Sequence, residues 1–179
     1  MDKRFIEALN FAALKHRKQY RDDKDKTPYI NHPINLAHIL AVEAGIEDVA
    51  ILITALLHDT IEDTDTTMED LAIHFGPRVA NLVAELSDDQ SPSIGERYEA
   101  QIRKTLLYSP DAKLIKLADR IANIRDALNN VEWTQERLFG HFKHARRQVD
   151  LLSGTNEILE NLFDAEYSKA ATMMQANSA

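Results

Sequence analysis

The chain has 179 residues, of which 44% are hydrophobic and 28% are charged. This balance is typical of a globular protein, and the length suits one domain better than two. The chain has no cysteine, which excludes disulfides, thiolate zinc sites and a cysteine nucleophile and fits a reducing compartment. Its net charge of −8 argues against general binding of nucleic acid.

The first residues form no apolar signal-peptide core, and the longest nearly apolar run, 49–57, is far shorter than the ~20 residues that span a bilayer. We therefore expect one cytoplasmic domain over residues 1–179, with no membrane partner. Whether this domain forms a homo-oligomer is left open.

Apolar residues recur at helical spacing throughout the chain, and no convincing alternating strand pattern occurs. This pattern predicts an all-α domain, a bundle of about eight to nine helices. The predicted helices cover 2–19, 33–44, the apolar run into 58–59, 67–76, 77–86, 96–107, 111–128, 134–152 and 155–174. Residues 20–26 and 87–95 are predicted loops, and 175–179 a frayed tail.

Several residues mark helix ends in this prediction. Pro33 and Pro77 suit the first turn of a helix, because the missing N–H of proline sacrifices no intrahelical bond there. Thr67 has the spacing of a capping box with Asp70. Gly45 is suited to a left-handed residue after a helix.

The most informative motif is His58-Asp59, which ends the apolar run and is followed by Glu62 and Asp63. Ionisable groups at the mouth of a buried element are costly unless a bound cation or another partner compensates for their desolvation. Within a helix, His58 and Glu62 share a face, and so do Asp59 and Asp63. His58 and Asp59 could flank one ion, although a solvated acidic helix end is a common alternative.

Two further polar residues strengthen the metal interpretation. His32 stands at the predicted start of a helix, where it could equally be an entry residue without a ligand role. Asp119 lies in a mostly apolar helix, with Lys116 and Asn123 on the same narrow face. Asp119 could simply pair with Lys116 or Arg120, or it could supply a ligand from a second helix.

Two imidazoles and two carboxylates form a donor set that suits Mn²⁺, with Fe²⁺, Zn²⁺ or Mg²⁺ as alternatives. The candidate ligands are His32, His58, Asp59 and Asp119. Such an ion acidifies water and offsets the negative charge of a phosphate. Glu62 and Asp63 would then be free to orient or deprotonate the water and to assist the leaving group.

The remaining histidines have no comparable neighbours. His141 and His144 share a predicted helix with several basic residues, which we interpret as a solvated basic face or an oligomer contact. Trp133 is expected to be a packing residue at a corner between helices. The sequence contains no Gly-rich phosphate loop and no serine nucleophile elbow.

A histidine, a His-Asp pair and a later aspartate, in this order, resemble the HD-domain metal phosphohydrolases. The finer motifs are TPYINHP at 27–33, ALLHDTIEDTDTT at 55–67, HFG at 74–76 and KLADRIANIRD at 116–126. They are similar to the hydrolase domain of the RelA/SpoT family, in particular the stand-alone small alarmone hydrolases that include the metazoan SpoT homologue. The resemblance covers nearly the whole chain, from about residue 5 to 161.

This resemblance implies an HD-domain helical fold and a Mn²⁺-dependent 3′-pyrophosphohydrolase of alarmone degradation in the stringent response. The implied substrates are guanosine tetra- and pentaphosphate (ppGpp and pppGpp), and the products are pyrophosphate and GDP or GTP. It assigns metal ligation to His32, His58, Asp59 and Asp119, catalysis to Glu62 and Asp63, and substrate binding to Arg21 and Asn123.

One position departs from the family, which typically has Arg-Lys where this chain has Arg21-Asp22. Lys24 or Lys26 could supply the missing cation, or Asp22 could point to solvent. Alternatively the enzyme could prefer another nucleotide, such as the adenosine alarmone ppApp or the 2′-phosphate of NADPH. A non-catalytic HD module that binds a nucleotide or a partner is a further hypothesis, which the complete ligand set argues against.

Overall fold

The computed structural model describes residues 2–88, 93–129 and 133–176. Within these ranges the chain forms helices and no strand, with one isolated bridge between Tyr20 and Pro28. The all-α prediction is confirmed: each predicted helix has a counterpart, and the single turn α4 is additional. The elements are α1 Lys3–Lys15, α2 Asn31–His38, the π-helical turn η1 Ile39–Glu43, α3 Val49–Leu57, α4 Thr60–Asp63, α5 Met68–Phe75, α6 Pro77–Leu86, α7 Ile94–Thr105, α8 Pro110–Leu128, α9 Gln135–Asp150 and α10 Glu157–Ala176.

The residues predicted to mark helix ends lie at helix ends in the structure. Pro33 lies in the first turn of α2, and Pro77 begins α6. Thr67 and Asp70 form the capping box of α5: the Asp70 N–H donates to Thr67 Oγ1 at 3.1 Å, and the Thr67 N–H donates to Asp70 Oδ2 at 2.9 Å. Gly45 has a φ of 67° after η1, as a left-handed cap requires.

The first helix ends at Lys15, earlier than predicted, because side chains after Lys15 make hydrogen bonds outside the helix. His16 Nδ1 lies 2.5 Å from Gln19 Oε1, and Gln19 Nε2 donates to the backbone carbonyl of Asp63 at 2.7 Å. These contacts tie residues 16–19 to α4 rather than to a continued helix. The second predicted helix widens into η1, where the Ala44 N–H bonds the Ile39 carbonyl at 2.9 Å.

The chain turns sharply at His58-Asp59, so the helix predicted through this pair is broken. His58 follows the last residue of α3, and Asp59 has φ −98° and ψ 0° before α4 begins. Thr60 holds the corner, because its hydroxyl donates to the carbonyl of Leu57 at 2.6 Å. The pair therefore lies at a corner between two helices, where the ends of both side chains can face one point.

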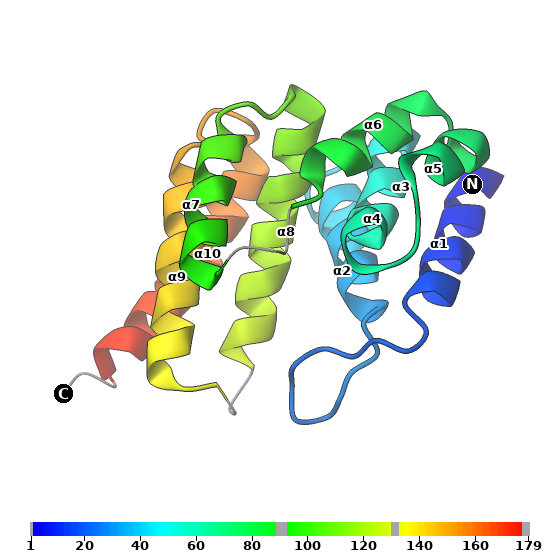
Figure 1. Ribbon diagram of the computed structural model, residues 1–179. Coiled ribbons are helices and arrows are strands. Elements are labelled where there is room, and N and C mark those ends of the chain that lie inside the picture. The colour runs from blue at the N-terminus through cyan, green and yellow to red at the C-terminus, as the bar shows by residue number, and fades with distance from the viewer. Residues whose placement is uncertain (1, 89–92, 130–132, 177–179) are drawn as a thin grey trace.

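The long helix α8 lies between two groups of helices, with α1 to α6 on one side and α7, α9 and α10 on the other (Figure 1). Most of its positions are buried, including Ile115, Leu117 and Ile121. Because α8 is buried from both sides, its polar residues are buried as well, and Asp119 is only 3% exposed. Such residues need partners from neighbouring elements.

Two predicted segments fall partly outside the described residues. Of the predicted loop 87–95, residues 89–92 lie outside them, and α7 already begins at Ile94. Of the predicted tail, α10 includes 175 and 176, and 177–179 lie outside. Among the residues described, no helix is both long and apolar enough to cross a membrane.

Candidate metal centre and adjacent pocket

Three of the predicted ligands meet at the corner between α3 and α4. One ligand atom from each of His32, His58 and Asp59 lies within 4.8 Å of the others. His58 Nε2 is 2.9 Å from Asp59 Oδ2, and the two imidazole centroids are 5.4 Å apart. Both histidines are buried. These residues could hold a metal ion, as the sequence predicts.

The backbone fixes which nitrogen of His58 faces the cluster. His58 Nδ1 lies 2.9 Å from the Ala55 carbonyl, which can only accept, so Nδ1 carries the proton. Nε2 then faces the carboxylates, and its lone pair could bind an ion there, the arrangement typical of a histidine ligand. The Tyr29 hydroxyl donates to Asp59 Oδ2, the same oxygen that faces His58 Nε2, and so helps to hold this carboxylate.

Asp119 reaches the same point from α8, with its two oxygens in different roles. Oδ2 pairs with Arg120 Nη2 at 2.5 Å and Lys116 Nζ at 3.4 Å. Oδ1 lies 3.3 Å from His32 Nε2 and 4.0 Å from His58 Nε2. Both interpretations of Asp119 are therefore realised in one side chain: it pairs with cations and also faces the histidines.

The charges at this corner favour an additional cation. Burial acts to lower the pKa of His58, but the neighbouring carboxylates of Asp59 and Asp119 together outweigh it and raise that pKa. Burial acts to raise the pKa of Asp59, yet the charge of His58 holds it below its usual range. A corner that keeps its carboxylates ionised and draws positive charge to nitrogen ligands fits a divalent ion.

The acidic pair Glu62 and Asp63 follows directly on α4. Glu62 Oε2 accepts the backbone N–H of Asp88 at 2.8 Å. Burial raises the pKa of Glu62, and the nearby Asp59 carboxylate adds to this increase. The Asp63 N–H donates to the Asp59 carbonyl at 2.8 Å, which places the pair one helical turn beyond the cluster.

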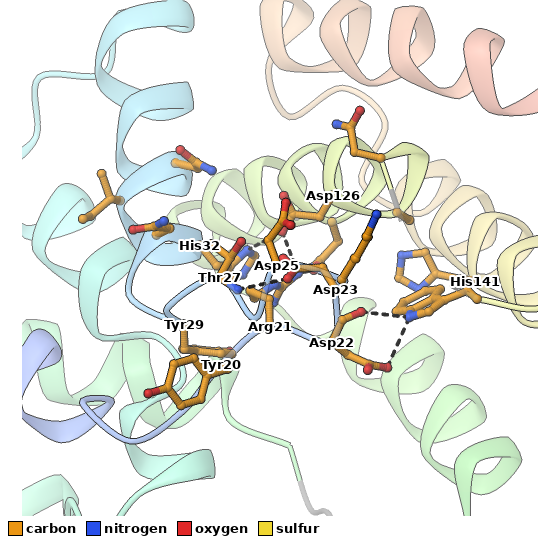
Figure 2. Close-up of a pocket in the computed structure, with 18 residues that line it drawn as sticks. Tyr20, Arg21, Asp22, Asp23, Asp25, Thr27, Tyr29, His32, Asp126 and His141 are labelled. Carbon is orange, nitrogen blue, oxygen red and sulfur yellow. Dashed lines mark hydrogen bonds and ion pairs between the residues drawn. The ribbon is translucent and has the colours of Figure 1, made fainter. Parts of the chain in front are cut away.

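A cavity of about 710 Å³ adjoins the cluster and shares His32 with it. Figure 2 shows this cavity between the loop before α2 and the helices α8 and α9. Arg21 and Asn123, the predicted substrate residues, lie together in its wall: Arg21 Nη2 donates to Asn123 Oδ1 at 3.1 Å and to Asp126 Oδ2 at 2.7 Å. The Asn123 amide in turn donates to Asp119 Oδ1 at 2.6 Å, so the cavity wall and the cluster are linked directly.

Asp22 lines the cavity and is held by Arg137 on α9 and by Trp133, which lies shortly before that helix. Its Oδ2 pairs with Arg137 Nη1 at 2.7 Å and accepts the Trp133 indole N–H at 3.2 Å, while its side chain stays 58% exposed. Of the two lysines that could replace the family lysine, Lys24 lines the cavity. Lys26, with a φ of 49°, is absent from the described lining.

The predicted solvated face on α9 is confirmed for Lys143 and Arg147, which are exposed, and is wrong for the two histidines. His141 lines the cavity with Trp133, and His144 is only 3% exposed. Burial lowers the pKa of His141 to about 4, and Arg120 acts in the same direction. Four apolar residues of α9 are buried: Leu138, Phe142, Ala145 and Val149. The helical spacing of these positions was the available signal, because 141 and 144 border that stripe.

Residues 8–145 match the HD domain family. Proteins named guanosine-3′,5′-bis(diphosphate) 3′-pyrophosphohydrolase MESH1 are similar over most of the chain. The Mus musculus protein is 49% identical over 158 residues, 87% of this chain and 88% of its own length. The Drosophila melanogaster protein is 49% identical over 90% of this chain and 91% of its own length. A solved structure described as a metazoan ortholog of SpoT that hydrolyses ppGpp has 47% identity and a TM-score of 0.90, and the match covers 94% of this chain and 96% of that one. This chain therefore belongs to the HD-domain family and, within it, to the group of the metazoan SpoT homologue.

Proposed function

We propose that this chain hydrolyses ppGpp and pppGpp, releasing pyrophosphate from the 3′ position and leaving GDP or GTP. The observation that carries the proposal is the junction of the cluster at His58-Asp59 with a cavity lined by Arg21 and Asn123. A pyrophosphate at the cluster and a nucleoside in the cavity would belong to one molecule. Relatives at 49% identity are named for this activity.

We propose Mn²⁺ as the cofactor, because imidazole and carboxylate ligands without sulfur suit it. His32, His58, Asp59 and Asp119 would hold it. When bound, such an ion acidifies water and offsets phosphate charge. Glu62, whose pKa burial raises, is suited to give up or take a proton, and Asp63 would orient the water. Arg21 and Asn123 would position the nucleotide.

We further propose that residues 1–179 act as one hydrolase domain. The cavity supports this, since its lining comes from the loop before α2, from α2 itself and from α8 and α9. A cytoplasmic location, and the absence of nucleic-acid partners, remain predictions from composition and charge. Homo-oligomer formation stays open.

The direct test is pyrophosphate release from ppGpp with and without added Mn²⁺. Asp59→Asn should abolish release, because it removes a charged ligand oxygen at the cluster. Asp65→Asn is the matched control: Asp65 pairs with Lys15 at the surface and is 88% exposed. The proposal fails if the purified wild-type chain releases no pyrophosphate from ppGpp, or if Asp59→Asn keeps full activity. Circular dichroism on the same samples checks folding, because losing one buried charge can destabilise a protein by about 3–5 kcal/mol.

Glu62→Gln separates catalysis from metal binding. We expect kcat to fall roughly 100-fold or more, the size of a lost acid–base group, with Mn²⁺ affinity nearly unchanged. Glu69→Gln on the exposed face of α5 is the control. An unchanged kcat in the Glu62 variant would remove this residue from the chemistry.

Asp22 supports a second candidate, an HD hydrolase for another nucleotide. Its carboxylate stands at the cavity where the resemblance expects a lysine, and Arg137 compensates its charge. An enzyme for ppApp or for the 2′-phosphate of NADPH is the alternative. A panel of ppGpp, ppApp and NADPH at equal concentrations with Mn²⁺ decides between them by the ratio of kcat/KM values.

A further inference from the structure

The cavity has two chemically different ends. Towards the cluster it is lined by Arg21, which donates hydrogen bonds to both Asn123 and Asp126. Towards α9 it is lined by the neutral rings of Trp133 and His141. These two rings meet edge to face, with centroids 5.5 Å apart and an interplanar angle of 81°. A molecule that fills both ends needs a polar part and a flat part.

His141 has hydrogen-bonding capacity that no described residue uses. Its Nε2 is buried and has no hydrogen-bond partner in the part of the chain that the structure describes. Leaving such a group unpaired costs about 1–3 kcal/mol. The low pKa of His141, about 4 because of burial, keeps the ring neutral at physiological pH. A neutral imidazole recognises the edge of a ligand rather than its charge.

Trp133 is held in place beside this nitrogen. Its indole N–H donates to the Asp22 carbonyl and to Asp22 Oδ2, each at 3.2 Å. The Arg137 guanidinium lies 3.8 Å from the centre of the indole ring, and it also pairs with Asp22. The orientation of Trp133 is thus set by partners on two elements, the loop before α2 and α9.

The charges of the cavity oppose a phosphate at the α9 end. The lining carries the carboxylates of Asp22, Asp23, Asp25 and Asp126 and the cations of Arg21 and Lys24. Arg21 is already paired with Asp126, next to the cluster. The α9 end is therefore better suited to an uncharged, planar group with polar edges, and a purine base has this chemistry.

We propose that Trp133 and His141 bind the guanine base of the substrate and that His141 is a specificity-determining residue, paired through Nε2 with the base edge. This inference rests on the proposed function for the identity of the substrate. It adds the end of the cavity at which the base lies and the side chain that recognises it.

The lone tryptophan of the chain makes binding measurable without turnover. We would titrate the full chain with GDP, which has the base but no 3′-pyrophosphate, and follow Trp133 fluorescence. GDP should change the emission, and inorganic pyrophosphate should not. His141→Phe keeps an aromatic ring beside Trp133 but removes both nitrogens, and it should weaken GDP binding roughly tenfold, the effect of one lost hydrogen bond to a buried group. His38→Phe, an exposed histidine outside this cavity, should bind GDP like the wild type.

The inference is overturned if wild-type emission ignores GDP, or if His141→Phe and His141→Gln both bind GDP as tightly as the wild type. If His141→Phe does not fold, His141→Gln replaces it in the test. The loss of GDP affinity should then be smaller, because glutamine keeps a polar group at this position. In turnover of ppGpp, the His141 variants should raise KM and leave kcat nearly unchanged, whereas a purely structural role would shift the unfolding midpoint instead. If GDP binds as expected but no pyrophosphate is released from ppGpp, the proposed function fails and the base site stands.

Discussion

Replacing His144 by glutamine would remove a buried imidazole that makes the fold sensitive to acid. The ring stacks on Tyr98 with centroids 3.9 Å apart, and Nε2 lies 2.7 Å from Gln101 Oε1. Because that oxygen accepts, Nε2 carries the proton of the neutral ring. Nδ1 is buried and has no hydrogen-bond partner among the described residues, so a second proton on the ring would find no acceptor.

Burial lowers the pKa of His144 from 6.5 to about 3, and nearby positive groups, above all Arg120, act in the same direction. Between these two values the unfolded chain binds a proton that the folded chain does not. The stability from His144 is therefore complete above pH 6.5 and declines as the pH falls towards 3. The full linkage is about 1.4 kcal/mol per pH unit. After a discount for solvent screening, we expect a loss of about 1 kcal/mol between about pH 7 and about pH 5.

Urea unfolding followed by circular dichroism, at about pH 7 and about pH 5, measures this contribution. The wild type should lose about 1 kcal/mol more unfolding free energy over the interval than His144→Gln does. His74→Gln, at an exposed histidine, should decline like the wild type. Equal declines in the wild type and His144→Gln would refute the argument that acid acts through this ring.

Further predictions concern packing and backbone geometry. Phe163 is fully buried on α10. Phe163→Ala should lower the unfolding free energy, measured in urea, by about 3–5 kcal/mol. Ser109→Ala should cost about 1 kcal/mol in the same assay, because Ser109 Oγ caps α8 by accepting the Ala112 N–H at 3.3 Å. Gly76 has a φ of 88°, so Gly76→Ala should lower the thermal midpoint by the equivalent of roughly 1–2 kcal/mol, although nothing lies within 4 Å of the added Cβ. Gly95→Ala within α7, also with open space, should be neutral or stabilising.

Features that depend on neighbours in sequence could be predicted from the sequence. The capping box at Thr67, the helix start at Pro77 and the turn at Gly45 each require only residues within one helical turn. The corner at His58-Asp59 could not be predicted in this way. The apolar run favours a continuing helix, and the break depends on the Thr60 hydroxyl and on packing against other elements.

In the candidate site too, some residues could be predicted from the sequence and others depend on how the helices pack. His32, His58 and Asp59 were found from motif spacing, and the structure brings their ligand atoms together. Trp133 packs against the core, as predicted, whereas the surroundings of His141 depend on where α9 packs against α8 and could not be predicted from α9 alone. A histidine at the border of an apolar stripe looks solvated until the neighbouring helix is placed beside it.

Asp119 shows why the sequence offered two interpretations that seemed exclusive. A buried carboxylate beside Lys116 and Arg120 has the pattern of an ion pair, and one beside histidines has the pattern of a ligand. The side chain has two oxygens, and the fold gives Oδ2 to Arg120 at 2.5 Å and Oδ1 to His32 at 3.3 Å. Pairing on one side fixes the carboxylate and, against the effect of burial, holds its pKa well below the usual range. The oxygen that faces the cluster is therefore charged and oriented because of the ion pair, so the structural role of Asp119 supports its role as a ligand.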